Sequence, residues 1–110
     1  MEPLPRLGRA TIDVLTVLLD SDEPRWGLEL IKLTGRPSGT VYPLLDRLER
    51  AGWATSDWDD DVLRPGPRRR MYQLTPDGTV AARDALRHEA RRPARARGGW
   101  VAQPGAGTLG

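Results

Sequence analysis

Residues 36–53 have the sequence Arg36-Pro-Ser-Gly-Thr-Val-Tyr-Pro-Leu-Leu-Asp-Arg-Leu-Glu-Arg-Ala-Gly-Trp53. Apolar residues recur in this stretch at the spacing of one helix face. They are Val41, Leu44, Leu45, Leu48 and Ala51. The opposite face carries Thr40, Tyr42, Asp46, Arg47 and Arg50. The pattern predicts an amphipathic helix with one face for a core and the other for solvent or a partner.

The ends of this helix can be predicted from three residues. Ser38 is placed to cap the first turn by accepting a hydrogen bond from a backbone N–H. Gly52 suits a left-handed residue just after the last turn. Pro43 removes one helical hydrogen bond and crowds the preceding turn, so it is tolerated best near the start of a helix. The helix is therefore predicted to begin close to Ser38, which places Thr40 and Tyr42 on its N-terminal turn.

Composition excludes several classes of protein. The chain has 110 residues, 38% of them hydrophobic, with no cysteine and one histidine, His88. Disulfides and thiolate metal sites are excluded, and one histidine cannot build a zinc site. The chain contains no catalytic elbow or phosphate-binding glycine loop, so neither an enzyme nor a cofactor is expected. No apolar run reaches the roughly 18 residues of a membrane span and no signal-peptide pattern is present, which predicts a cytoplasmic protein.

Charge is distributed unevenly along the chain. Residues 1–63 hold 7 basic and 12 acidic side chains, whereas residues 64–110 hold 10 basic and 3 acidic ones. All ten basic residues of the second segment are arginines. Arginine binds phosphate oxygens through two parallel hydrogen bonds, so this segment could contact a polyanion. The alternative is a solubilising preference for arginine in a protein with a single lysine, Lys32.

Two more helices are predicted before the opening stretch. Residues 1–8 are expected to be an irregular lead-in. Apolar periodicity predicts a first helix over Thr11–Asp20 and a short second helix over Leu28–Leu33, with Leu28 and Ile31 facing the core. The second helix and the helix of the opening stretch are joined by a short turn that contains Gly35. Two helices joined in this way match a helix-turn-helix.

Extended segments follow the opening stretch. Residues 53–58 and 68–74 favour strands, and the intervening Asp59–Pro67 has the composition of a loop. Such a hairpin directly after a helix-turn-helix is a wing. Thr75 is then placed to cap a last helix over 75–92, with Pro76 at its first position. Residues 93–110 are rich in Gly, Pro and Arg and are predicted to form a flexible tail.

The predicted fold is mainly α with a small β-hairpin (α+β). It is a winged helix-turn-helix over residues 9–74, with three helices and a two-stranded wing, followed by a C-terminal helix. At this level the sequence resembles the PadR family of bacterial transcriptional regulators. Three segments carry the resemblance, and together they fall within about residues 10–86. They are Trp26–Ile31, Ser38–Gly52 and Gly66–Gly78.

The resemblance implies a homodimeric, DNA-binding repressor, in some members released by a small aromatic ligand. The third helix would enter the major groove of a pseudo-palindromic operator, and the basic wing, about residues 64–70, would hold the backbone or reach the minor groove. The C-terminal helix would work with the first helix in dimerisation, although Pro93 and the tail after it depart from the long helix of the family. The candidate DNA contacts are Arg36, Ser38, Gly39, Thr40, Tyr42, Arg47, Arg68, Arg69 and Arg70.

Several of these residues have a second interpretation. Tyr42 could pack on the scaffold, and Arg47 could pair with a neighbouring acid on its own helix. Trp100 could anchor the tail or form the wall of a pocket for an aromatic ligand. At the level of the whole protein, the alternative is a winged-helix module that binds other proteins and has no specific DNA binding of its own.

Overall fold

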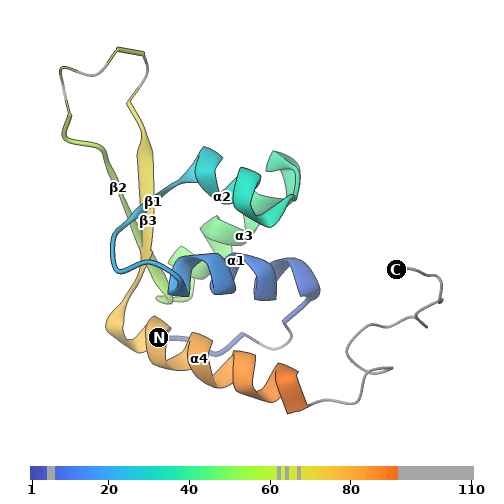
Figure 1. The fold of residues 1–110 in the computed structure, drawn as a ribbon. Coiled ribbons are helices and arrows are strands. Elements are labelled where there is room, and N and C mark those ends of the chain that lie inside the picture. Colours follow the sequence, from blue (N-terminus) through green and yellow to red (C-terminus); the bar gives the residue numbers. More distant parts are fainter. Residues whose placement is uncertain (5–6, 62, 64, 67, 92–110) are drawn as a thin grey trace, which may run out of the picture.

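The computed structural model describes residues 1–4, 7–61, 63, 65–66 and 68–91. Four helices and three short strands make up this part of the chain (Figure 1). In chain order they are α1 (Arg9–Leu19), β1 (Arg25–Trp26), α2 (Gly27–Thr34), α3 (Ser38–Arg50), β2 (Ala54–Trp58), β3 (Arg70–Leu74) and α4 (Pro76–Arg91). The order confirms the predicted α+β winged helix-turn-helix.

The core lies where α1, α2 and α3 meet. The apolar face predicted for residues 41–51 is confirmed, because every member is buried. The largest side chains that are fully buried are Val14, Leu15, Leu30, Val41, Leu45 and Leu48. The prediction for Leu28 is wrong, since its side chain is 43% exposed and Leu30 faces the core instead. Two residues apart on a helix, these side chains point in nearly opposite directions, and Ile31 is half-buried between them.

The start of α3 differs from the prediction in one detail. Pro37 is the capping residue and Ser38 is the first helical residue, whose side chain makes no capping bond. The carbonyl of Pro37 accepts the N–H groups of Thr40 and Val41, each at 3.0 Å. The side chain of Pro37 has no acceptor for the first N–H groups of the helix. Ser38 lies one position too late to cap them, and its side chain is exposed on the first turn.

The end of α3 is as predicted. Gly52 has a φ of +84°. The N–H of Trp53 donates to the carbonyl of Leu48 at 2.8 Å, and that of Gly52 donates to Glu49 at 3.0 Å. These two bonds form a Schellman motif, which satisfies the last carbonyls of the helix and directs the chain into β2.

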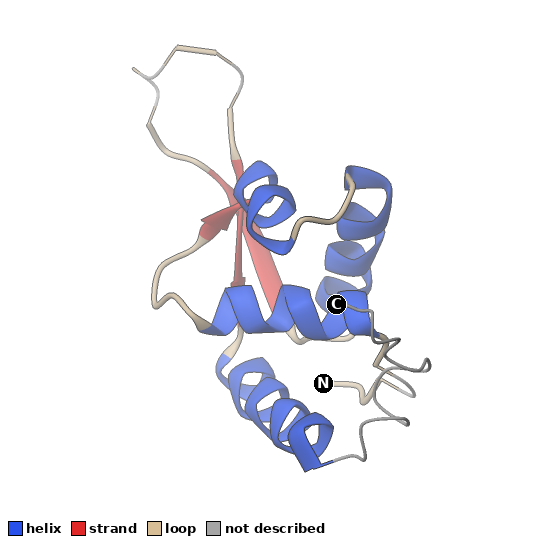
Figure 2. Cartoon of the chain, turned by 45° about the vertical axis from the view of Figure 1, so that its right-hand side comes forward, coloured by secondary structure: helices blue, strands red, loops and turns tan. Residues whose placement is uncertain are grey.

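The sheet has one strand more than the sequence predicts. Its order is β1-β3-β2, with all neighbours antiparallel, and Trp26 lies opposite Met71 in β3. The longer pair, β2 and β3, projects from one end of the helical body as the wing, whereas α4 lies at the opposite end (Figures 1 and 2). A two-residue strand carries no detectable periodicity, so the sequence predicts Arg25–Trp26 only as a lead into α2.

The start of α4 is held by two features. The Thr75 hydroxyl accepts the N–H of Gly78 at 2.8 Å, so the predicted cap is present. Gly78 itself is buried against the backbone of Trp53. From this end α4 runs along α1 (Figure 2). The predicted tail, residues 93–110, lies outside the described residues.

The N-terminal lead-in contacts the end of α3. The backbone N–H of Glu2 donates to the carbonyl of Ala51 at 2.7 Å. The indole Nε1 of Trp53 donates to the carbonyl of Glu2, also at 2.7 Å. Residues 1–4 contain no helix or strand, yet they are tied to the C-terminal end of α3.

Candidate nucleic-acid interface

The N-terminal turn of α3 presents polar groups on the surface. Ser38 and Gly39 are exposed and Thr40 is half-buried. Pro43 lies in the second turn and has no N–H, so the carbonyl of Gly39 lacks its usual helical donor. This turn therefore offers a hydroxyl at Ser38, a second hydroxyl at Thr40 and the backbone carbonyl of Gly39, which are groups suited to base edges or phosphates.

Tyr42 both packs and remains accessible. A Cβ atom built on Gly27 would lie 2.9 Å from Cε1 of the Tyr42 ring, so the ring rests directly on the backbone at the start of α2. The side chain is nevertheless 40% exposed. One side of the ring therefore packs on the scaffold as the second interpretation predicts, while the rest remains accessible, and contact of Tyr42 with DNA stays a prediction.

Two wing arginines are held over one tryptophan. The guanidinium carbon of Arg68 lies 5.6 Å from the centre of the Trp58 ring, and that of Arg70 lies 5.0 Å from it. Cation–π contacts of this kind fix a guanidinium in place without neutralising its charge. Arg68 is exposed, and Trp58 itself is 45% exposed.

Arg69 is directed elsewhere. Its guanidinium carbon lies 4.1 Å from the centre of the Trp26 ring, a close stacking distance. Its Nε is buried and has no hydrogen-bond partner among the described residues. The arginine run of the wing is thus divided between two tryptophans, one in β1 and one in β2, a division that sequence reasoning missed because it does not predict β1.

A polar chain links α3 to the wing. The Ser56 hydroxyl donates to Oε2 of Glu49 at 2.6 Å and accepts from Nε of Arg70 at 3.0 Å. Beside it, burial raises the pKa of the Tyr72 hydroxyl, and the neighbouring charge of Arg70 opposes that rise. The link joins a helix residue to both wing strands, and nothing in the sequence pattern points to it.

Arg36 and Arg47 lie outside the N-terminal turn of α3, since Arg36 precedes the helix and Arg47 lies near its C-terminal end. Arg36 donates from Nε and from a terminal nitrogen to the same carboxylate oxygen of Asp13, at 3.0 and 2.9 Å. Its charge is thus shared with α1. Arg47 is exposed beside the lead-in, and the nearby ion pair is formed by Arg50 and Asp46 at 3.1 Å.

The acidic limb of the wing bonds to its own backbone. Asp59 accepts the N–H of Asp61 at 3.2 Å, and Asp61 accepts that of Leu63 at 3.1 Å. Carboxylates in such turns stabilise the loop locally. The acids therefore have a structural role at the wing tip, on the limb opposite the arginines.

These elements enclose a surface groove of about 560 Å³, here called the wing groove. Its described lining residues come from β1, the start of α2, the N-terminal part of α3 and both limbs of the wing. They are Trp26, Gly27, Leu28, Tyr42, Trp58, Pro65, Arg68 and Arg70. Tyr42, Arg68 and Arg70 thus border one concave surface, which places one of the predicted helix contacts beside two of the predicted wing contacts.

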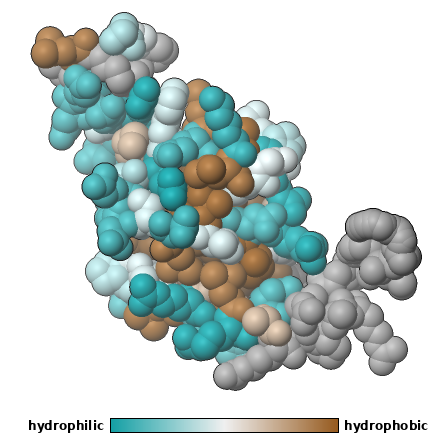
Figure 3. Space-filling view, viewed as in Figure 1, coloured by the Kyte–Doolittle hydropathy of each residue, from teal (hydrophilic) through white to brown (hydrophobic). Residues whose placement is uncertain are grey.

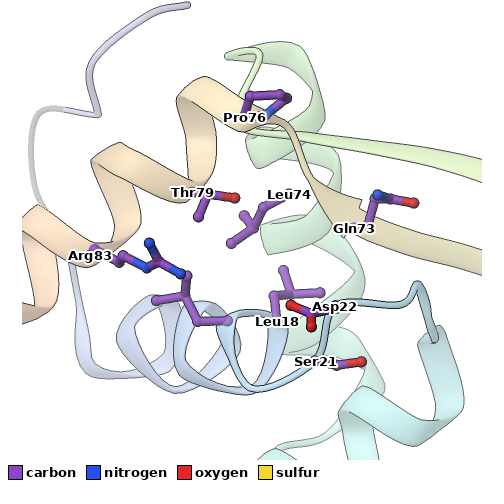
Figure 4. Close-up of a pocket in the computed structure, with 9 residues that line it drawn as sticks. Leu18, Ser21, Asp22, Gln73, Leu74, Pro76, Thr79 and Arg83 are labelled. Atoms are coloured by element: carbon purple, nitrogen blue, oxygen red, sulfur yellow. The ribbon is translucent and has the colours of Figure 1, made fainter.

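A second cavity, of about 240 Å³, lies away from this surface, between α1, the end of β3 and the start of α4 (Figure 4). Leu18 and Leu74 line its apolar part, and Thr79 and Arg83 reach it from α4 (Figure 4). Asp22 lines the side next to α1. Its described lining includes none of the predicted DNA contacts.

The remaining predicted ligand residue, Trp100, lies outside the described residues. Within the described ranges, no three histidine or acidic side chains are grouped to hold a metal ion. No helix in that same part of the chain is long and apolar enough to cross a membrane.

Comparison with known proteins identifies the family. Residues 14–84 match the transcriptional regulator PadR-like family. A PadR family transcriptional regulator from Eggerthella lenta is 32% identical, with a TM-score of 0.54 over 68% of this chain and 69% of its own. No curated protein matches the sequence.

Two further solved structures share the fold. BpsR from Bordetella bronchiseptica, whose regulation of DNA binding by 6-hydroxynicotinic acid was studied, is 22% identical with a TM-score of 0.66, over 93% of this chain and 73% of its own. The repressor CouR, solved on a 23-mer DNA duplex, is 24% identical with a TM-score of 0.65, over 79% of this chain and 58% of its own. The family consists of regulators rather than enzymes, in line with the prediction of no catalysis. The match over residues 14–84 and the winged helix-turn-helix agree that the chain belongs to the PadR-like family of transcriptional regulators.

Proposed function

We propose that the protein is a homodimeric, sequence-specific DNA-binding repressor. The observation that carries the proposal is the wing groove, where Tyr42 of α3 and the wing residues Arg68 and Arg70 border one surface. The N-terminal residues of a recognition helix contact base edges, and a basic wing beside it neutralises phosphates. The same fold is bound to a DNA duplex in CouR. A protein with this partner acts where the DNA is, in the cytoplasm.

Each proposed contact has its own role. Thr40 and Tyr42 contact base edges, while Ser38 and Gly39 approach the backbone at the helix start. Arg68, Arg69 and Arg70 supply sequence-independent affinity through phosphates or the minor groove. Arg36 and Arg47 add phosphate contacts at the flanks of α3. The hydrogen bond from Arg36 to Asp13 holds the Arg36 side chain in position for this contact.

Dimerisation through α1 and α4 places two recognition helices on one duplex. Hydrophobic surface continues over α1 and α2 on the face in Figure 3. A surface groove of about 290 Å³ runs between α1 and α4. Its apolar lining is formed by Ile12, Leu86 and Ala90. A second copy packed along α1 and the groove beside α4 would cover apolar area that a monomer leaves in water. The two α3 helices would then enter major grooves about 34 Å apart.

Relief of repression by a small aromatic ligand is part of the proposal. DNA binding of BpsR, which shares the fold, is regulated by 6-hydroxynicotinic acid. The candidate that the sequence offers for such a ligand is Trp100, whose alternative role is to anchor the tail.

Selection from a random DNA pool tests the proposed function. Duplexes retained by the protein over several rounds are sequenced, and light scattering gives the mass of the free protein. We expect a dimer and an enriched inverted repeat whose half-sites are centred about 10 base pairs apart, one turn of the double helix. A monomer that enriches no sequence would contradict the proposal and would favour a winged-helix module for protein partners.

Two substitutions separate specificity from general affinity. Thr40→Ala is expected to change the preferred base at one position of each half-site, at a cost of about 1–3 kcal/mol against the original operator. Arg68→Gln is expected to weaken operator and random duplexes alike and to lower the salt dependence by about one ion. Equal effects of Thr40→Ala on both kinds of duplex would contradict the role assigned to Thr40.

A further inference from the structure

The side of α3 that points away from the core forms a narrow ridge. The core-facing side runs from Val41 to Leu48, so the positions half a turn away face solvent. These positions recur every three or four residues, and all four residues there are exposed. They are Gly39, Pro43, Asp46 and Arg50, here called the α3 ridge. A helix that enters the major groove presents this side to the base pairs, yet neither Asp46 nor Arg50 is among the contacts assigned above.

The α3 ridge changes in character along the helix. Gly39 has no side chain and Pro43 has a short ring, so the first two turns allow DNA to approach closely. Asp46 and Arg50 supply the charge of the ridge, in its C-terminal half. Side chains of a helix lean toward its N-terminus, so the long side chain of Arg50 extends back along the ridge toward the turns that lie deepest in the groove.

Arg50 is held by Asp46. Its Nε lies 3.1 Å from Oδ2 of Asp46, one turn earlier in the helix. The contact is made through Nε, which leaves the two terminal nitrogens for a second partner. Arg36 differs, because it donates from both Nε and a terminal nitrogen to Asp13. The Arg50 side chain is 81% exposed, so a partner can reach the guanidinium without movement of α3.

The chemistry of this pair suits guanine. Two parallel donors on one guanidinium match the O6 and N7 acceptors of guanine, the one base that presents two acceptors in the major groove. An isolated carboxylate on this surface would repel the phosphates. Paired with Arg50, the carboxylate of Asp46 restrains the guanidinium and so reduces the entropy lost on binding. The other acid of α3, Glu49, is already bonded to Ser56 of the wing.

We propose that Arg50 contacts a guanine in the major groove through its two terminal nitrogens, and that Asp46 is the positioning residue that orients this guanidinium. The inference rests on the proposed function, because Arg50 meets a base only when α3 lies in the groove. It assigns a second specific base pair to each half-site. This base pair differs from the one at Thr40, since Arg50 lies about three turns further along the helix.

Base preferences of the wild type and of two arginine variants test the contact. For the wild type, we expect a guanine in each half-site whose replacement by adenine weakens binding by about tenfold or more. Arg50→Ala should bind the two duplexes equally. The matched control is Arg87→Ala, which removes the same charge from the exposed Asp84–Arg87 pair of α4 and should keep the preference for guanine. A wild type that selects no guanine, or an Arg50→Ala variant that keeps every wild-type preference, would overturn the inference.

Asp46→Ala separates orientation from charge. Loss of the carboxylate should raise the affinity for a scrambled duplex by about twofold or more, because one negative charge fewer opposes the phosphates. The preference for guanine should nevertheless fall about fivefold, because the guanidinium is no longer restrained. Binding of the scrambled duplex also shows that the variant is folded. An equal rise in affinity for every duplex would mean that Asp46 only repels DNA, which rules out the positioning role.

The wild-type chain separates this inference from the proposed function. Equal binding of operator and scrambled duplexes by the wild type refutes the proposed function, and the inference falls with it. Sequence-specific binding by the wild type, with base preferences that Arg50→Ala leaves unchanged, overturns the inference alone and leaves the proposed function standing.

Discussion

Gly78→Ala is expected to destabilise the protein, although alanine normally favours a helix. Gly78 lies in the first turn of α4, and a Cβ there would lie 2.7 Å from the carbonyl carbon of Trp53 and would overlap its oxygen. That oxygen also accepts the N–H of Thr75 at 2.9 Å, so it cannot turn away without loss of a bond. The added methyl must therefore push α4 away from the start of β2.

The magnitude follows from two opposing effects. Replacing glycine by alanine in a helix is worth up to about 1 kcal/mol in favour of folding. Overpacking against fixed atoms costs about 1–3 kcal/mol, and a backbone obstacle belongs at the upper end of that range. The net loss in the free energy of unfolding is therefore about 2 kcal/mol. For a domain of this size, the loss lowers Tm by roughly 10 °C.

Urea denaturation followed by circular dichroism measures this loss. Gly39→Ala is the matched control, because Gly39 lies in the first turn of α3 and a Cβ there meets no atom within 4 Å. We expect the control to keep or slightly raise the stability of the wild-type chain. A Gly78→Ala variant as stable as the Gly39→Ala variant would refute the close packing of α4 on Trp53.

Four further substitutions test the fold. Thr75→Ala removes the cap on Gly78 and should cost about 1 kcal/mol, whereas Ser38→Ala caps nothing and should change the stability by less than about 0.5 kcal/mol; urea midpoints compare them. Leu45→Ala empties a fully buried site and should cost about 2–5 kcal/mol in the same assay. Burial raises the pKa of Tyr72 in the folded chain, so its contribution is complete below about pH 10 and is lost as the pH rises through that raised pKa. The Tyr72→Phe variant, which has no hydroxyl to ionise, should therefore lose less stability than the wild type between about pH 9 and 11 in urea titrations; identical pH profiles would contradict this.

The sequence was most informative where a local rule and the tertiary fold agree. Spacing alone identified the buried face of α3, and Gly52 and Thr75 cap their helices as their residue types predict. The motif around Tyr42 was sufficient to indicate the family. These features depend on neighbours within a few positions of the chain, which is why a pattern search detects them.

The features that the sequence did not predict depend on contacts between distant segments. β1 is two residues long and exists because Arg25 and Trp26 pair with β3, about 45 positions later. The capping role predicted for Ser38 is wrong because Pro37 occupies the capping position and Ser38 is already the first helical residue. Leu28 faces outward because the start of α2 borders the wing groove rather than the core.

In the candidate site, too, local features could be predicted from the sequence and contacts between distant segments could not. The sequence identified Tyr42 and the arginine run as candidate contacts, and it could not tell how the arginines would be distributed. Arg69 stacks on Trp26 while Arg68 and Arg70 lie over Trp58, a division that follows from strand alternation and the third strand together. The link from Glu49 to Ser56 likewise required the three-dimensional arrangement.

The most direct test of the central claim is a comparison of two affinities over a salt series. Binding of the selected operator duplex and of a scrambled duplex with the same composition is measured by fluorescence anisotropy from low to physiological salt. The account predicts that both affinities fall as salt rises, and that the operator is bound about 1,000-fold or more tightly than the scrambled duplex at physiological salt. Equal affinity for the two duplexes at every salt concentration would contradict the claim that α3 contacts specific bases.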